Sequence, residues 1–272
     1  DYELFIGVYN RVVKQFGLSP LSFRLTSYIE APQGSGLGTS SSIVVSLLGA
    51  FVEWLNLPLG KYDIAHLAYE IERIDLNLAG GKQDQYAATF GGINFLEFLG
   101  NDKVIVNPLN LKSKIVNELE LNLLLYFTAT QRESARIITD QVKNVEQKNT
   151  QAIEAMHNLK AQALQMKDHL IRGELAKMGE ILRFGWENKK RMAQSISNLT
   201  IDEIYEAALN AGASGGKISG AGGGGFMFFF CPGVTKISVA KSIERFGGKV
   251  QPFKFTSQGL TDRKSTRLNS SP

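Results

Sequence analysis

A glycine-rich stretch at residues 32–42, with the sequence PQGSGLGTSSS, has the residue types and spacing of a phosphate site. Glycine lets backbone N–H groups approach an anion, and the N-terminus of a following helix adds unpaired donors and a positive dipole end. The hydroxyl groups that come next can cap that helix and offer oxygen ligands to Mg²⁺. We therefore expect phosphate groups to bind along these residues: Gly34, Ser35, Gly36, Leu37, Gly38, Thr39, Ser40 and Ser41.

The spacing of these glycines argues against two common nucleotide motifs. No Gly-Lys-Ser/Thr follows the loop, and the pattern is G-x-G-x-G where dinucleotide enzymes have G-x-G-x-x-G. A dinucleotide site also needs an acid about 20 residues further on, and Glu53 comes too early while Asp63 comes too late. The remaining alternative is a tight strand-to-helix turn with an ordinary cap.

A second cluster, GGKQDQY at residues 80–86, contains a carboxylate that phosphoryl transfer could use. Transfer to a hydroxyl needs one carboxylate that orients or deprotonates the hydroxyl and another acid that helps to hold Mg²⁺ against the phosphates. Asp84 and either Glu70 or Glu72 are the candidates for these roles. The alternative is that Asp84 caps a helix starting at Gln85 and that both glutamates are solvated.

A third glycine cluster occupies residues 215–225, GGKISGAGGGG, directly before the segment FMFFF. So many glycines are costly in conformational entropy, so the backbone must approach something closely. That partner is either a ligand or another segment of the chain.

A phosphorylated substrate would need a basic group remote from its reacting hydroxyl. Arg132 follows a predicted buried strand in a loop, which is a good position for binding. Lys189, Lys190 and Arg191 form a charge run, for which a solvated helix face is the alternative. None of the three histidines has a metal-ligand spacing.

Hydrophobic periodicity predicts the elements that position these groups. The loop is expected between a half-buried strand and an amphipathic helix, and a second helix carries the two glutamates. Expected strands are 21–30, 91–98, 104–109, 121–128, 226–230 and 249–255, and expected helices are 43–55, 62–74, 140–172 (as one helix or a pair), 174–194 and 201–211. This mixture predicts an α+β protein of two domains with a boundary near residue 118.

The composition indicates a soluble globular protein of 272 residues with 43% hydrophobic residues. No apolar run reaches the roughly 18 to 20 residues that cross a bilayer, and no secretory signal opens the sequence, so we expect a cytoplasmic protein without a membrane or nucleic-acid partner. Its net charge of +4 comes partly from residues 261–272, which resemble a non-native or disordered tail. The single cysteine, Cys231, follows three phenylalanines and is expected to be buried and structural.

Three segments resemble the GHMP kinases, and in chain order PxGSGLGTSSS is similar to the second motif of that superfamily, GGKQDQYAATFGG to the segment with its catalytic aspartate, and KISGAGGGGF to the third motif. The resemblance implies ATP and Mg²⁺ as cofactors, a catalytic Asp84, and Mg²⁺ ligands at Ser40 and Glu72, with Thr39 and Glu70 as the alternatives. It also suggests that Lys82, Gln83, Arg132, Gly222, Gly223 and Lys189 bind the substrate.

The resemblance covers about residues 4–260 and implies a two-domain fold with a part like domain 2 of ribosomal protein S5 (1–118) and a ferredoxin-like part (119–260). The segments FVEWLNLPLGKYDIAHLAYEIER and FGWENKKRMAQSI are similar to kinases of D-glycero-D-manno-heptose 7-phosphate, which implies phosphorylation of the anomeric hydroxyl. A fucose-type or galactose-type kinase and a non-catalytic sugar-binding protein are the alternatives. The first motif of the family is not present, so weak or no turnover is expected, and a homodimer is among the possible oligomeric states.

Overall fold

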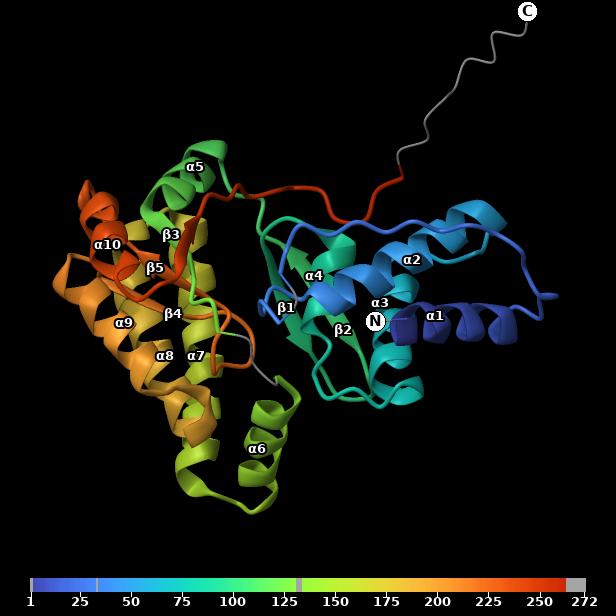
Figure 1. Cartoon of the computed structure of the whole chain (residues 1–272), viewed down its shortest axis with the longest axis horizontal. Coiled ribbons are helices and arrows are strands. Elements are labelled where there is room, and N and C mark those ends of the chain that lie inside the picture. The colour runs from blue at the N-terminus through green and yellow to red at the C-terminus, as the bar shows by residue number, and fades with distance from the viewer. Residues whose placement is uncertain (1, 33, 131–133, 263–272) are drawn as a thin grey trace, which may run out of the picture. The chain divides into compact units, whose positions relative to one another are not determined.

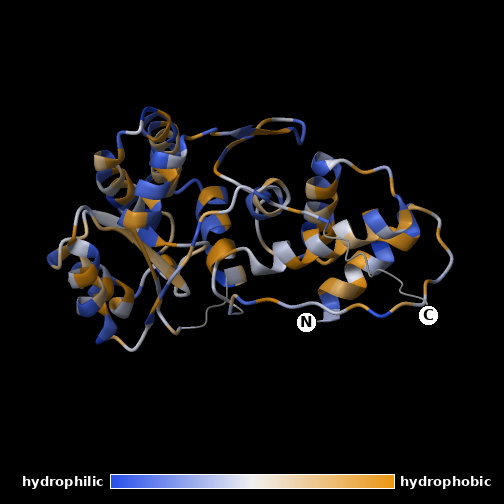
Figure 2. Cartoon of the chain, turned by 90° about the horizontal axis from the view of Figure 1, so that it is seen from above, coloured by the Kyte–Doolittle hydropathy of each residue, from blue (hydrophilic) through white to orange (hydrophobic). Residues whose placement is uncertain are grey.

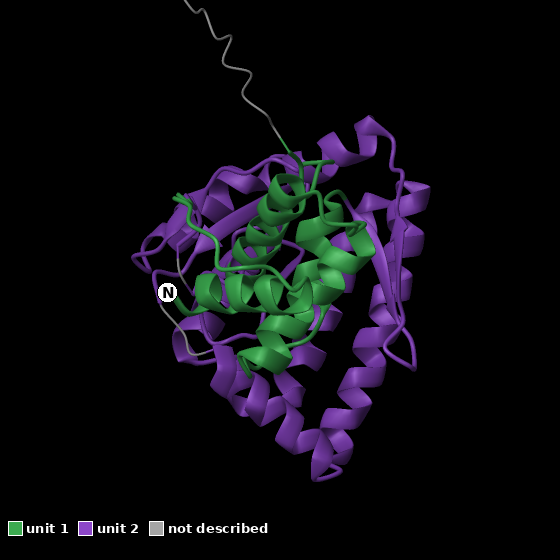
Figure 3. Cartoon of the chain, turned by 90° about the vertical axis from the view of Figure 1, so that its right-hand side faces the viewer, with its two compact units in different colours: residues 1–27, 40–92, 256–272 green, residues 28–39, 93–255 purple. Residues whose placement is uncertain are grey.

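The chain divides into two units, which Figure 3 shows in green and purple. The computed structural model describes residues 2–32, 34–130 and 134–262. Unit 1 comprises residues 1–27, 40–92 and 256–272, and unit 2 comprises residues 28–39 and 93–255. The predicted boundary near residue 118 stays a prediction, because compact units and inherited domains need not coincide.

Unit 1 is built from helices that share one hydrophobic core. They are α1 (Tyr2–Gln15), α2 (Thr39–Leu55), α3 (Lys61–Glu70) with its π-helical continuation η1 (Ile71–Asp75), and α4 (Gln83–Phe90). The predicted helices at 43–55 and 62–74 are therefore confirmed, while α1 was not predicted. Its signal is present in the sequence, since Leu4, Val8 and Val12 recur every four residues and are buried.

Residues 21–30, predicted as a strand, form no strand in the structure. A strand needs a neighbouring strand to pair its backbone N–H and C=O groups, and the described residues offer none here. The Leu21 N–H group instead donates to the Tyr9 hydroxyl at 3.1 Å. The alternation of apolar and polar side chains correctly indicated burial, because Leu21 and Leu25 pack against the helical core. Alternation alone, however, does not supply a strand to pair with.

Unit 2 contains two antiparallel sheets. One is the hairpin of β1 (Asn94–Phe98) and β2 (Val104–Pro108), and the other has the order β4 (Gly215–Ile218), β5 (Phe226–Phe230), β3 (Leu123–Phe127) and β6 (Lys249–Gln251). Helices separate β3 from β4 and β5 from β6, so the second sheet has the βαββαβ connectivity of a ferredoxin-like fold, as predicted. The predicted strand at 249–255 is shorter than expected, and the third glycine cluster begins as strand β4.

The helices of unit 2 are mostly those that the periodicity predicted (Figure 1). The segment 140–172 belongs to a helical pair, and α7 and α8 pack along each other. Blue and orange alternate along the helices in Figure 2, as expected where one face is buried. The remaining helical bounds are α5 (Ser113–Asn122), α6 (Ser134–Glu146), α7 (Thr150–Arg172), η2 (Leu175–Lys177), α8 (Met178–Met192), η3 (Gln194–Ile196), α9 (Leu199–Asn210) and α10 (Thr235–Glu244).

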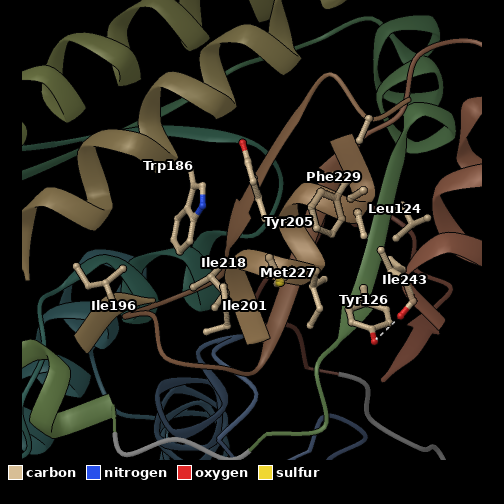
Figure 4. Packing of buried hydrophobic residues seen from close by; sticks show 14 of the residues in the cluster. Leu124, Tyr126, Trp186, Ile196, Ile201, Tyr205, Ile218, Met227, Phe229 and Ile243 are labelled. Carbon is tan, nitrogen blue, oxygen red and sulfur yellow. Dashed lines mark hydrogen bonds between the residues drawn. The ribbon is translucent and has the colours of Figure 1, made fainter. Parts of the chain in front are cut away.

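The four-stranded sheet packs one face into a core that Figure 4 shows from close by. Tyr126 is fully buried there, and its hydroxyl donates to the Ile243 carbonyl at 3.0 Å and accepts from the Gly248 N–H group at 2.9 Å. Burial raises the pKa of this phenol. Burial likewise raises the pKa of the Cys231 thiol to about 12, so the expected structural role of this cysteine is supported. Within the described residues, no helix has both the length and the apolarity to traverse a bilayer.

We expect Tyr126→Phe to lower the free energy of unfolding by about 1–3 kcal/mol, because the partly buried Gly248 N–H group loses its acceptor. Tyr28→Phe is the control, since Tyr28 is 86% exposed and its hydroxyl can bond to water. Urea unfolding followed by circular dichroism measures both variants. Equal stability of the two variants would contradict the role given to the Tyr126 hydroxyl.

Candidate active site

The glycine loop at residues 34–38 has a backbone that requires glycine. Gly34, Gly36 and Gly38 have φ values of 72°, 78° and 70°, in the left-handed region that costs other residues about 1–2 kcal/mol. Helix α2 begins at Thr39, immediately after the loop. The Thr39 hydroxyl lies 3.2 Å from the Ser35 hydroxyl, which closes the turn across the loop.

The loop presents backbone donors that the protein itself does not use. Among the described residues, the N–H groups of Gly36, Leu37 and Gly38 have no hydrogen-bond acceptor. The first N–H groups of any helix are also unpaired, and α2 has no acidic residue in its first turn to compete for them. Alternating left-handed and right-handed residues before a helix N-terminus form the concave arrangement of donors that binds anions.

The third glycine cluster packs directly against this loop within unit 2. The Phe226 N–H group donates to the Ser35 carbonyl at 3.0 Å, and the Ser219 hydroxyl donates to the Gly36 carbonyl at 2.9 Å. A Cβ atom on Gly225 would lie 2.4 Å from the Ser35 carbonyl oxygen. Gly225 is therefore glycine because the first glycine loop approaches it, whereas Gly222 and Gly224 are approached by Ile196 and Thr130.

The substrate-binding candidates in unit 2 lie around the same cluster. The Gly223 N–H group donates to the Ile196 carbonyl at 2.8 Å, and a Cβ atom on Gly222 would come within 2.7 Å of that carbonyl. The Lys189 ammonium donates to the Gly220 carbonyl. Lys189 thus contacts the third glycine cluster through this hydrogen bond. Arg132 lies outside the described residues.

The other two cations of the charge run point to acids of unit 2. Lys190 pairs with Asp202 at 3.5 Å, and Arg191 pairs with Glu154 at 2.7 Å. The run therefore does not act as a single patch of free cations.

The candidate metal ligands meet in unit 1. Glu72, on η1, has no exposed surface, and its Oε1 atom accepts from the Ser40 hydroxyl at 3.0 Å. Its Oε2 atom accepts from the Ser41 hydroxyl at 2.7 Å. Glu70 instead pairs with Arg11 and is partly exposed, while the Thr39 hydroxyl bonds to Ser35. The geometry therefore favours Ser40 and Glu72 over Thr39 and Glu70 as the pair that could hold a cation.

Asp84 lies in the first turn of α4 and is exposed. The helix starts at Gln83 after Lys82, so Asp84 does not cap a helix that starts at Gln85. A carboxylate in the first turn is stabilised by the helix dipole and can also face a ligand. Gln83 is exposed as well, and the Lys82 ammonium lies 4.6 Å from the centre of the Tyr69 ring.

Two residues of this region were not among the predicted site residues. The Gln85 amide donates to Glu72 Oε2, and Arg73 lies 3.8 Å from Glu72 Oε1 while donating to the Gly81 carbonyl at 3.2 Å. Their spacing in the sequence gives no signal for either contact. The π-helical turn at η1 and the packing of α3 on α4 create both.

Comparison with known proteins shows which family shares these features. The model of the GHMP kinase N-terminal domain matches residues 3–92, and that of the GHMP kinase C-terminal domain matches residues 166–248. The chain is 48% identical over 258 residues to the D-glycero-alpha-D-manno-heptose 7-phosphate kinase of Campylobacter jejuni, covering 95% of this chain and 76% of that protein.

Solved structures agree with the sequence comparison. The D-glycero-D-manno-heptose 1-phosphate kinase from Bacteroides thetaiotaomicron matches with a TM-score of 0.78 at 46% identity, over 95% of this chain and 73% of that one. The galactokinase of Lactococcus lactis, solved with galactose, matches with a TM-score of 0.71 at 16% identity, over 96% and 76% of the two chains. The second likeness concerns the fold alone.

We expect Gly225→Ala to separate the two glycine loops of unit 2, because its Cβ atom would collide with the Ser35 backbone. Gly233→Ala is the matched control, since Gly233 also has a positive φ but has open space around it. Gly225→Ala should cost about 1–3 kcal/mol more than Gly233→Ala in denaturant unfolding, which is the usual range for overpacking. Equal losses would show that the loops do not need this close approach.

Proposed function

The chain belongs to the GHMP kinase family, and from that premise we propose that it transfers the γ-phosphoryl group of ATP to the anomeric hydroxyl of D-glycero-D-manno-heptose 7-phosphate. The observation that carries the choice of acceptor is the 48% identity to the Campylobacter jejuni enzyme along 95% of this chain. The product would be the 1,7-bisphosphate.

The glycine loop is the part of the chain that suits the phosphates of ATP. Its free N–H groups at Gly36, Leu37 and Gly38 can donate to phosphate oxygens, and the N-terminus of α2 favours the negative charge. Packing of the Ser219–Phe226 segment against the loop fixes the direction of these donors before the nucleotide binds. Preorganised donors lose little entropy on binding, so they are effective in phosphoryl transfer.

Ser40 and Glu72 fit the requirements of Mg²⁺. Adjacent ligands of an octahedral Mg²⁺ ion with bonds of about 2.0–2.1 Å lie about 2.9 Å apart, and the Ser40 Oγ and Glu72 Oε1 atoms are 3.0 Å apart. The described residues contain no group of three or more His, Cys, Asp or Glu side chains that could hold a metal by themselves, and Mg²⁺ in kinases needs only one or two carboxylates besides the phosphates. Bound there, Mg²⁺ would offset the charge that develops on the transferred phosphoryl group.

Asp84 would act on the acceptor. Its exposed carboxylate can accept a hydrogen bond from the anomeric hydroxyl and take the proton as the oxygen attacks the γ-phosphorus. The new O–P bond forms while the bond between the γ-phosphorus and the β-phosphate oxygen breaks, and ADP leaves with that oxygen. We assign binding of the sugar phosphate to the neighbouring Lys82 and Gln83, and also to Gly222, Gly223, Lys189 and Arg132, on the strength of the family resemblance.

An acceptor assay tests the proposed function. ADP release is followed with ATP, Mg²⁺ and, in separate reactions, heptose 7-phosphate, heptose 1-phosphate, galactose, fucose and mevalonate. We expect turnover with heptose 7-phosphate and product carrying the new phosphate on the anomeric oxygen, identified by ³¹P NMR. Preference for heptose 1-phosphate would reassign the phosphorylated position, and turnover with galactose, fucose or mevalonate alone would overturn the choice of acceptor.

Asp84→Asn should lower kcat by about 10²- to 10⁴-fold, the usual contribution of a general base, because the amide orients a hydroxyl but cannot take its proton. The affinity for ATP should change little, since Asp84 is not part of the glycine loop. Asp168→Asn, at an exposed position on α7, is the control for loss of one surface charge. Steady-state kinetics and calorimetric titration with ATP measure the two effects, and a kcat equal to that of the parent protein would exclude Asp84 as the base.

A further inference from the structure

We propose that Gln85 is a positioning residue that fixes the carboxylate of Glu72 for metal binding and joins the helix of Asp84 to the metal site. The proposal rests on the proposed function and goes beyond it, because it assigns a role to a side chain that would touch neither the metal nor the substrate. All residues in the argument belong to unit 1.

The contact itself is buried and polar. Gln85 and Glu72 have no exposed surface, and the Gln85 amide donates to Glu72 Oε2. The side chain must present its nitrogen to the carboxylate, because an amide oxygen there would place two acceptors against each other. Hydrogen bonds to a charged acceptor in a buried setting are about twice as strong as neutral ones.

Gln85 leaves its other polar atom without a partner. The Oε1 atom is buried and has no hydrogen-bond donor within the part of the chain that the structure describes. An unpaired buried acceptor costs about 1–3 kcal/mol, so a residue chosen for stability alone would not carry it. The amide is therefore better explained by what its nitrogen does for Glu72 than by packing.

Of the four neighbours of the Glu72 carboxylate, two contact each oxygen. Ser41 and Gln85 donate to Oε2, whereas Oε1 faces Ser40 and lies 3.8 Å from Arg73. Two donors on Oε2 prevent the carboxylate from rotating, so Oε1 keeps its 3.0 Å spacing to the Ser40 hydroxyl. Partners of this kind, which orient a metal-binding carboxylate, typically change metal affinity by about 10- to 100-fold when removed.

The same contact links the metal site to the catalytic helix. Gln85 follows Asp84 in the first turns of α4, and Arg73 holds the Gly81 carbonyl just before that helix. Tyr86 anchors α4 further by packing edge-on against Tyr62 of α3. A shift of Glu72 would therefore be transmitted to the helix that presents Asp84.

The test compares the parent protein with Gln85→Met and Gln85→Glu. Methionine keeps the length and removes the donor, whereas glutamate keeps the shape and replaces the donor with an acceptor. Gln162→Met is the matched control: Gln162 is also buried and donates from its amide, but to the Ile181 carbonyl in unit 2. Binding of Mn²⁺, as a spectroscopic substitute for Mg²⁺, is measured by electron paramagnetic resonance with a non-hydrolysable ATP analogue, and Mg²⁺ activation is measured by ADP release.

We expect both Gln85 variants to weaken Mn²⁺ binding and raise the Mg²⁺ concentration for half-maximal activity by about 10- to 100-fold, with a smaller change in the KM for the acceptor. Gln162→Met should lose stability without changing either metal measurement. Folded Gln85 variants that bind Mn²⁺ as the parent protein does would overturn the positioning role. If Gln85→Met does not fold, Gln85→Glu decides by the same measurement, and absence of nucleotide-dependent Mn²⁺ binding by the parent protein would contradict the proposed function instead.

Discussion

A carboxylate without exposed surface must find its hydrogen bonds inside the protein, and Glu72 is such a group. Leaving it unpaired would cost several kcal/mol, so the surrounding side chains have to supply donors. Ser40, Ser41 and Gln85 do so, with Arg73 nearby. The start of α2, the π-helical turn η1 and the start of α4 are thereby held together in unit 1.

In unit 2 the main constraint is the backbone conformation of the first glycine loop. The loop at 34–38 can present its N–H groups to an anion only with three left-handed glycines. Such a loop has few side-chain contacts to hold it, so the Ser219–Phe226 segment supports it with backbone and hydroxyl hydrogen bonds. Gly225 in the supporting segment leaves room for this approach, because a Cβ atom there would lie 2.4 Å from the Ser35 carbonyl oxygen.

The sheet of unit 2 explains how this support stays rigid. β5 follows the third glycine cluster directly and pairs with both β4 and β3. Residues 219–225 therefore connect two strands that are paired with each other. Tyr126 on β3 ties the sheet to α10 and to the turn before β6 from inside the core. The glycine-rich loop is thus carried by a well-packed sheet, as is common for binding loops in proteins.

The sequence by itself determined the features that depend on neighbouring residues. Glycine spacing identified both loops, and periodicity identified the helices at 43–55 and 62–74. The role of Asp84 stays a prediction that rests on the family resemblance. Backbone preference and burial of one face act over a few residues, so they can be read locally. The family resemblance, which comparison with known proteins confirmed, came from the same local motifs.

Only the tertiary structure decided which distant groups meet. It put Glu72 rather than Glu70 beside Ser40, gave the Glu72 carboxylate a hydrogen bond from Gln85, brought residues 34–38 against residues 219–226, and left residues 21–30 outside any strand. Each of these outcomes depends on a hydrogen-bond partner far away in the chain. Such partners are selected by the packing of whole helices and sheets, and no local preference specifies them.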